Sequence, residues 1–308
     1  MIQIEQLTKR YGKMEALKGV SLSIEKGTVF GFVGPNGAGK STTMSILATL
    51  LEPTSGKAYV GGFDVIKHPR EVRKLIGYMP DFFGVYDYLT AEEYLDFYGA
   101  NYDIPPEERK AIIPQLLELV NLSHKRDAYV DSLSRGMKQR LGLARCLVHN
   151  PEVLILDEPA SGLDPRARIE LREILKELRD MGKTIIISSH ILPELAEMCD
   201  VIGVIEEGNL VAFGKVEEIY ARMQEKRVLR IRLLDRVDEA MARLREVPTV
   251  AGVTREGNWV VVGFSGDDAD QAKLLRDLTV NDFPVAAFNE AQGDLEEIFL
   301  EITKGVGS

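Results

Sequence analysis

A glycine-rich segment of nine residues constrains the fold of this 308-residue chain more than any other part of its sequence. It consists of Gly34, Pro35, Asn36, Gly37, Ala38, Gly39, Lys40, Ser41 and Thr42, and it follows an apolar run at 29–33. The spacing Gly-x-x-x-x-Gly-Lys-Ser is that of a P-loop, which joins a buried strand to a helix. Apolar residues at helical spacing come directly after it, at 44–50. The sequence therefore predicts a strand–loop–helix unit of an α/β fold.

A P-loop binds phosphate, because its glycines let backbone N–H groups surround an anion at the start of a helix. We expect all nine residues of the segment to contact the polyphosphate of a nucleotide. Lys40 is predicted to reach its β- and γ-phosphates, and the hydroxyl of Ser41 is predicted to bind Mg²⁺. The alternative is a glycine-rich turn before an ordinary helix. The buried strand predicted in front of the loop argues against that alternative.

The composition is that of a globular chain, with 45% hydrophobic residues over a length that suggests one large domain and a smaller one. No apolar run approaches the roughly 20 residues of a membrane span, and the N-terminus lacks the layout of a signal peptide. We therefore expect a soluble, cytoplasmic protein. Cys146 and Cys199 lie in apolar segments, which favours reduced, buried thiols over a disulfide or a metal site. The net charge of −10 argues against broad nucleic-acid binding.

Two kinds of strand pattern predict two layers of sheet. Alternating residues at 2–7 and 20–24 indicate an antiparallel β edge layer, and continuous apolar runs at 153–156 and 184–187 indicate central parallel strands. The segment 89–140 is helical in pattern, with Thr90 as an N-cap and a break at prolines 105–106. The predicted fold class is an α/β P-loop NTPase core with a parallel central sheet, an antiparallel edge layer and an α-helical insert.

Two carboxylates follow the predicted central strand at 153–156. Asp157 and Glu158 lie at the carboxyl edge of the sheet, where α/β folds bind their ligands. We expect Asp157 to hold the Mg²⁺ coordination shell and Glu158 to orient or deprotonate the water that attacks the γ-phosphate. A solvated acidic strand end is the alternative. The P-loop upstream favours the catalytic interpretation.

The segment 133–140 resembles the signature motif of ATP-binding-cassette (ABC) proteins. The family usually has glycine where Arg135 stands and glutamine where Met137 stands, whereas Ser134 and Gly136 match the motif. Variants of this kind occur among exporter-type ATPases of the family. The resemblance implies that Ser134 and Gly136 bind nucleotide, since a hydroxyl, backbone N–H groups and a helix N-terminus form a second phosphate cradle.

Further matches to the ABC family follow in the family's order over roughly residues 1–220. Tyr11 stands where the family places an aromatic residue that stacks on adenine. The segment 161–164 resembles the loop through which two such domains communicate. His190, at the end of a predicted strand, matches the switch histidine that contacts the γ-phosphate. The resemblance thus implies an ABC-type ATP-binding domain at 1–220.

Asp81 is a departure from the family pattern, which normally has glutamine at this position as a sensor of Mg²⁺. We expect Asp81 to retain the role, because a carboxylate binds Mg²⁺ directly or through water. An aromatic cluster follows, made of Phe82, Phe83, Tyr86 and Tyr88. Part of it is predicted to be ordinary core. By resemblance, part of it lines a groove that receives a helix of the membrane partner.

The family motifs stop beyond Gly214, and a charged segment at 217–226 leads into a different pattern. Strands are predicted at 229–233, 259–264 and 285–288, and helices around 240–244, at 269–278 and from Asp294 onward. The sequence predicts a small C-terminal α+β accessory domain at 227–308. Its ending at 294–300 resembles the tail of ABC ATPases that serve drug, antibiotic or polysaccharide efflux.

The resemblance as a whole implies the ATPase subunit of an exporter-type ABC transporter. Such a subunit works with integral membrane permease subunits on separate chains, and it closes around ATP as a homodimer or as a heterodimer with a second cassette. It would be peripheral on the cytoplasmic face of the cell membrane. A soluble ABC ATPase that remodels ribosomes or DNA is the alternative, but such relatives carry two cassettes or a long coiled coil. A P-loop kinase of small molecules lacks the signature and the switch histidine.

Overall fold

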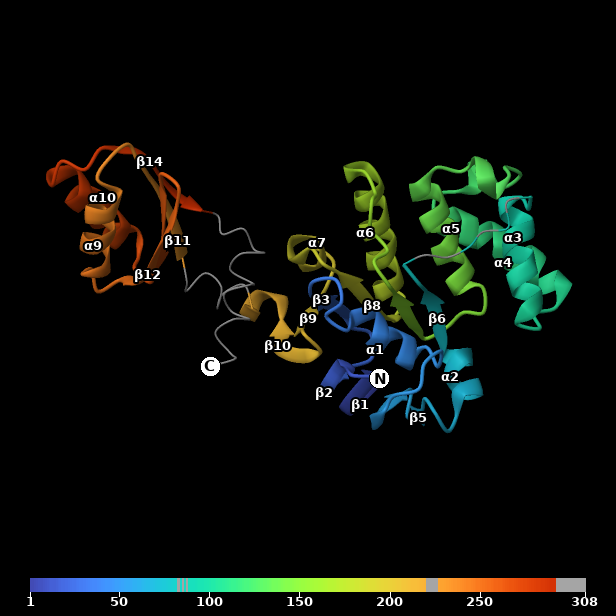
Figure 1. The fold of residues 1–308 in the computed structure, drawn as a ribbon. Coiled ribbons are helices and arrows are strands. Elements are labelled where there is room, and N and C mark those ends of the chain that lie inside the picture. Colours follow the sequence, from blue (N-terminus) through green and yellow to red (C-terminus); the bar gives the residue numbers. More distant parts are fainter. Residues whose placement is uncertain (82–83, 85, 87, 220–226, 292–308) are drawn as a thin grey trace. The chain divides into compact units, whose positions relative to one another are not determined.

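The computed structural model describes residues 1–81, 84, 86, 88–219 and 227–291 (Figure 1). The chain divides into two compact units, Met1–Val216 and Glu217–Ser308.

The first unit is built on a six-stranded sheet. Its strands, in spatial order, are β10 (Asn209–Lys215), β9 (Val201–Glu206), β3 (Val29–Val33), β8 (Thr184–Ser189), β7 (Val153–Leu156) and β6 (Ile76–Met79). All neighbours pair in parallel except β10, which is antiparallel to β9. Every residue of β3, β7 and β8 is buried, as expected for strands covered on both faces. The predicted parallel central sheet is confirmed.

A second sheet of the same unit is antiparallel in all its pairings. It has the order β2 (Met14–Ile24), β1 (Ile2–Tyr11), β4 (Ser55–Val60) and β5 (Phe63–Asp64). The inward side chains of β1 and β2 alternate with exposed ones and join one hydrophobic cluster with helix α1 (Lys40–Leu47) and strand β3. The predicted antiparallel edge layer is therefore also confirmed.

Helices α2 (Pro69–Leu75), α6 (Pro165–Asp180) and α7 (Leu192–Ala196) belong to the same unit as the central sheet. Helix α6 is strongly amphipathic and buries Leu171, Ile174, Leu175 and Leu178 along one side. Its N-cap is Asp164, whose carboxylate accepts a hydrogen bond from the backbone N–H of Ala167 at 2.8 Å.

The segment predicted as a helical insert contains α3 (Ala91–Asn101), α4 (Pro106–Leu119) and the start of α5 (Arg135–Leu147), which lie together in Figure 1. Thr90 caps α3 in a reciprocal capping box with Glu93, as its position suggested. The sequence pattern predicted helix throughout 89–140, and this prediction is wrong for the part between α4 and α5. Between α4 and α5 the chain forms short 3₁₀ turns at Ser123–Lys125 and Val130–Ser132, because Asn121 takes a left-handed conformation and ends α4.

Gly77 in strand β6 permits a close approach between the central sheet and helix α5. A Cβ atom at this position would lie 2.4 Å from the carbonyl oxygen of Cys146, which belongs to α5. Beside this contact, the guanidinium of Arg145 donates a hydrogen bond to the carbonyl oxygen of Tyr78 at 3.2 Å. Helix α5 is thus held directly against the strand that leads to Asp81.

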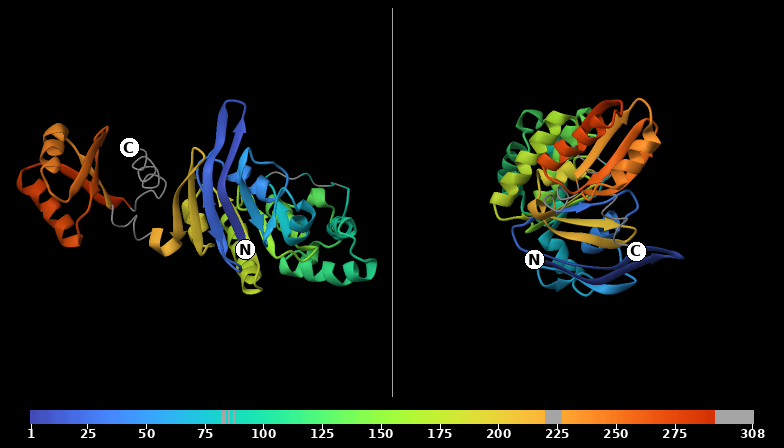
Figure 2. Two further views of the ribbon diagram at one scale, coloured as in Figure 1. Left: turned by 90° about the horizontal axis from the view of Figure 1, so that it is seen from below. Right: turned by 90° about the vertical axis from the view of Figure 1, so that its left-hand side faces the viewer.

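The described part of the second unit has the element order strand–helix–strand–strand–helix–strand. The elements are β11 (Arg227–Leu233), α9 (Val237–Arg245), β12 (Val250–Glu256), β13 (Trp259–Phe264), α10 (Asp268–Val280) and β14 (Val285–Ala291). All strand pairs are antiparallel, in the order β12-β13-β11-β14. This topology is the ferredoxin-like, or split βαβ, arrangement. Both helices lie on one side of the sheet (Figures 1 and 2) and share a core with its inward residues.

Strand β12 is absent from the sequence prediction. Only Val253 of its seven residues is buried, so its pattern carries no clear alternation of apolar and polar side chains. Phe82, Phe83 and the helix predicted from Asp294 lie outside the described residues. Tyr86 and Tyr88 of the aromatic cluster are exposed. None of the helices in the described part of the chain combines the length and apolar character of a membrane span.

We predict that Gly77→Ala destabilises the first unit by about 1–3 kcal/mol, because the added methyl group must push helix α5 away from β6. Urea denaturation followed by circular dichroism measures the change. Gly84→Ala is the control, since a Cβ atom there would meet no other atom within 4 Å. Equal stability of the two variants would contradict this account of the contact.

We predict that half-buried His149 makes stability fall as the solution is acidified. Its ring stacks on Tyr102 at 3.8 Å, its Nε2 lies 2.8 Å from the carbonyl oxygen of Ile76, and burial lowers its pKa from 6.5. The unfolded chain therefore takes up this proton at a higher pH than the folded one, so stability is lost as the pH falls below about 6.5. His149→Gln should flatten the dependence of the urea midpoint on pH between 7.5 and 5. Parallel curves for both proteins would refute the assignment.

Candidate functional site

The P-loop joins β3 to α1 at the carboxyl edge of the central sheet. Gly39, the N-cap of α1, has φ 114°, a conformation that favours glycine, and a Cβ atom at Gly34 would lie 2.2 Å from the carbonyl oxygen of Ile205. Residues Pro35, Asn36 and Gly37 form the exposed tip of the loop, whereas Ala38 and Gly39 are buried. The glycines therefore stand where the backbone has no room for a side chain or takes a conformation that other residues avoid.

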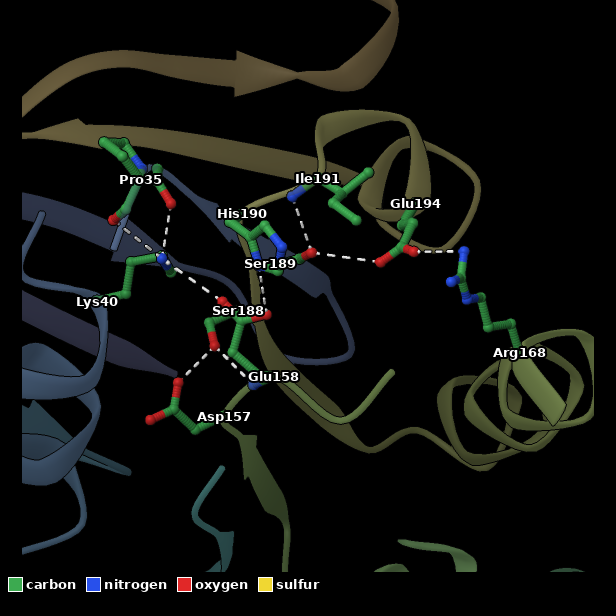
Figure 3. Close-up of polar contacts among 11 residues, drawn as sticks. Pro35, Lys40, Asp157, Glu158, Arg168, Ser188, Ser189, His190, Ile191 and Glu194 are labelled. Carbon is green, nitrogen blue, oxygen red and sulfur yellow. Dashed lines mark hydrogen bonds and ion pairs between the residues drawn. The ribbon is translucent and has the colours of Figure 1, made fainter. Parts of the chain in front are cut away.

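Lys40 lies almost completely inside the loop, with 5% of its surface exposed. Its ammonium donates hydrogen bonds to the carbonyl oxygens of Gly34 at 2.6 Å and Pro35 at 3.2 Å, and lies 3.5 Å from Oε1 of Glu158 (Figure 3). Ser41 is exposed and Thr42 is half-buried at the first turn of α1. A buried ammonium held by neutral carbonyl groups and one carboxylate is ready to exchange these partners for the oxygens of an anion.

Glu158 is the point at which elements far apart in the sequence meet. Its side chain is 12% exposed; Oε1 faces Lys40, and Oε2 lies 3.1 Å from Nδ1 of His190. Oε1 accepts no hydrogen bond among the described residues and has only the longer ion pair with the lysine. The backbone of Glu158 has φ 49°, which is unusual for a residue other than glycine and is found at many functional sites.

Asp157 lies deeper than its neighbour, with 3% exposure. Its Oδ1 accepts a hydrogen bond from the hydroxyl of Ser188 at 2.5 Å, and its backbone N–H donates to Met79 at 2.8 Å. Burial raises the pKa of the nearby Tyr78 hydroxyl, and the negative charge of Asp157 raises it further. Strand β6 pairs with β7, so that Met79 lies beside Leu156. The segment that leads to Asp81 therefore begins next to Asp157 and Glu158.

The structure does not bring every predicted site residue to this cluster. Within the described residues, no hydrogen bond or ion pair connects the P-loop to Tyr11, Asp81, Ser134 or Gly136. Tyr11 ends strand β1, is 46% exposed and has the ammonium of Lys9 5.2 Å from its ring centre. Asp81 is exposed beyond β6. These residues lie on the surface, where a ligand or a second molecule has access to them.

The signature segment forms the N-terminus of α5. Ser134 is its N-cap and accepts a hydrogen bond from the backbone N–H of Met137 at 3.3 Å. Gly136 faces helix α6, since a Cβ atom at this position would lie 3.1 Å from Cβ of Ala167. The guanidinium of Arg135 covers Gly162, so the residue that departs from the family pattern contacts the segment 161–164.

Three polar contacts beyond those predicted from the sequence link helix α6, the segment 161–164, helix α7 and strand β8. Arg168 on α6 donates a hydrogen bond to the carbonyl oxygen of Leu163 at 3.1 Å. It also forms an ion pair with Glu194 at 2.7 Å (Figure 3). Glu194 lies in turn 3.4 Å from the hydroxyl of Ser189. This connection is absent from the sequence prediction, because it joins charged residues whose pairing depends on how α6 and α7 are placed.

The two cysteines take no part in the site. Both are buried and unpaired, and burial raises the pKa of each thiol. The prediction of buried, free thiols without a disulfide is confirmed.

Comparisons with known proteins agree with this geometry. Residues 17–161 match the family model described as ABC transporter, and residues 214–303 match that of the ATP-binding protein DrrA1-3-like, C-terminal domain. The chain is 33% identical to the linearmycin resistance ATP-binding protein LnrL of Bacillus subtilis, over 98% of both chains. It is 34% identical to the bacitracin transport ATP-binding protein BcrA of Bacillus licheniformis, over 99% of this chain and 98% of that one.

A solved structure of an ATP-binding cassette is also similar to this chain. A dimeric ATP-binding cassette in a post-hydrolysis state, bound to ADP and Pi, superposes with a TM-score of 0.64 at 27% identity, over 70% of this chain and 99% of that one. The chain belongs to the family of ABC transporter ATP-binding proteins. It binds ATP and acts as the ATPase subunit of a transporter. These relatives do not favour the alternative, an ATPase that remodels ribosomes or DNA. Subunits of this family dimerise and work with separate membrane components.

Proposed function

We propose that the cluster around Glu158 is the hydrolytic centre of this ATPase. The observation that carries the proposal is the position of the Glu158 carboxylate, between the ammonium of Lys40 and the ring of His190. In this assignment the P-loop residues 34–42 bind the triphosphate of ATP, and Lys40 moves from the loop carbonyl groups to the β- and γ-oxygens. Glu158 then holds the attacking water and accepts its proton, while His190 contacts the γ-phosphate.

The donor atoms of the site fit Mg²⁺, which prefers hard oxygen ligands. The exposed hydroxyl of Ser41 and the carboxylate of Asp157 stand beside the P-loop and at the end of β7, and Oδ2 of Asp157 is outside the hydrogen bond to Ser188. We propose that these two residues hold the ion, with Asp81 acting directly or through water. When bound, the ion would neutralise charge on the phosphate oxygens. Ser41 and Asp157 would orient it, and the burial of Asp157 would hold that carboxylate in one position.

We propose that the nucleotide site is completed by a second cassette. Tyr11, at the exposed end of β1, would stack on adenine. Ser134 and Gly136 would close over ATP bound to the P-loop of the other copy, in a homodimer or a heterodimer. Their exposed or half-exposed position at the start of α5, without a contact to the P-loop of the same chain, supports this arrangement. ATP would then hold the dimer together, and hydrolysis would release it.

We propose that the transport is export and that the subunit lies on the cytoplasmic face of the membrane, bound to permease subunits on separate chains. The names of relatives aligned over nearly the whole chain, which refer to linearmycin resistance and bacitracin transport, support this direction. The C-terminal unit at 227–308 would be an accessory domain of the kind found in the DrrA-like proteins.

We predict that Glu158→Gln lowers the ATPase rate by about 10²-fold or more, because the amide cannot accept the proton of water. ATP should remain bound and hold a dimer, which size-exclusion chromatography with light scattering detects at saturating ATP and Mg²⁺. Lys40→Ala is the control that should remain monomeric, since it loses phosphate binding. A Glu158→Gln protein that hydrolyses ATP at the normal rate would contradict the proposed role of this residue.

We predict that Asp81→Ala raises the Mg²⁺ concentration for half-maximal ATPase activity by about tenfold, as expected for the loss of a residue that acts on the ion directly or through water. A titration with Mg²⁺ at fixed ATP measures it. Asp127→Ala, which removes another exposed carboxylate from the same unit, should leave the titration unchanged. Identical curves for both variants would show that Asp81 has no part in the metal site.

A further inference from the structure

A buried hydroxyl connects the two carboxylate residues of the site. Ser188, near the end of β8, has no exposed surface. Its Oγ lies 2.5 Å from Oδ1 of Asp157 and 2.8 Å from the backbone nitrogen of Glu158 (Figure 3). One side chain from a neighbouring strand therefore contacts both residues that follow β7.

The direction of both hydrogen bonds follows from their chemistry. The backbone N–H of Glu158 can only donate, so the oxygen of Ser188 accepts this hydrogen bond. The single hydroxyl proton is then free to point at Asp157, whose carboxylate accepts it. Because the N–H group can only donate and the carboxylate can only accept, the hydroxyl bridges the two residues and fixes them relative to each other.

The backbone of Glu158 needs such a partner. A φ of 49° is unfavourable for a residue with a side chain and persists only where neighbouring groups hold it. The hydrogen bond to Ser188 acts on this peptide group, and the same backbone conformation aims the carboxylate at Lys40 and His190. Loss of the hydroxyl would remove one restraint on that orientation and leave a buried N–H without its partner.

We propose that Ser188 is a positioning residue of the hydrolytic centre. It holds Asp157 in the orientation needed for the metal and Glu158 in the orientation needed for the attacking water, without touching substrate itself. This inference rests on the roles proposed above for Asp157 and Glu158. Its observable consequence is a loss in kcat and in Mg²⁺ affinity, while binding of ATP through the P-loop is retained.

Thr184, at the other end of the same strand, provides a matched control. Its side chain is also fully buried, and its Oγ1 accepts a hydrogen bond from the backbone N–H of Gly27 at 2.9 Å. Thr184→Val removes this hydroxyl while keeping the shape of the side chain. Both Ser188→Ala and Thr184→Val thus leave one partly buried N–H group without its partner, but only Ser188 contacts Asp157 and Glu158.

The experiment compares kcat, KM for ATP, the Mg²⁺ concentration for half-maximal activity and the Tm of the two variants. We expect both to lower Tm, and only Ser188→Ala to lower kcat and to raise the Mg²⁺ requirement, each by about 10–100-fold. KM for ATP should change by less than about threefold, as the P-loop contacts are unaffected. Ser188→Cys, with a weakly hydrogen-bonding thiol of similar shape, should show the same loss if the alanine variant does not fold.

Normal kcat and Mg²⁺ dependence in a folded Ser188→Ala or Ser188→Cys protein would overturn the proposal. Equal loss of kcat in Thr184→Val would also overturn it, because the effect would then be one of stability. Glu158→Gln serves as the reference. If Glu158→Gln hydrolyses ATP normally, the proposed role of Glu158 fails; if it is inactive and Ser188→Ala is fully active, only the role of Ser188 fails.

Discussion

The parallel pairing of three buried strands positions the P-loop, the two carboxylates and His190. In this register Val33 of β3 lies beside Ser189 of β8, and Leu156 of β7 lies beside Ile187. The P-loop, the two carboxylates and His190 follow these strand ends, so they meet at one edge of the sheet. Because the strands are covered on both faces, a shift in register would expose apolar side chains, and the packing energy of the core thereby maintains the distances within the site.

The site holds charged side chains at positions where burial would normally be unfavourable. Lys40, Asp157 and Glu158 are nearly buried, and such charges persist in proteins only where partners compensate for lost hydration. The compensation here comes from the carbonyl groups of the P-loop, from the hydroxyl of Ser188 and from the charges themselves. A site of this kind is prepared for a polyanion with a divalent cation, because both would pair with groups that are already oriented.

The second unit follows different rules from the first. Its sheet is antiparallel, with two helices on one face, and its core is formed by side chains that alternate along β11 and β13. That alternation made both strands predictable, since apolar and polar residues that alternate along the chain indicate a half-buried strand. Strand β12 was not predictable, because Val253 is its one buried residue, Val250 is only half-buried, and the strand is held mainly by its pairing with β13. The ferredoxin-like topology follows only from the strand order.

The sequence by itself determined the P-loop and the acidic strand end, and it showed that segment 133–140 resembles the signature motif and that His190 follows a strand. Each of these features depends on residues adjacent in the chain, where spacing carries the chemistry. Tertiary structure decided which of these groups meet. It joined Glu158 to Lys40 and His190, paired Arg168 with Glu194, and placed Ser188 between the carboxylate of Asp157 and the backbone N–H of Glu158. Local patterns cannot encode such contacts, since a polar residue at a buried strand end acquires its partners only when the strand order and register bring them within hydrogen-bonding distance.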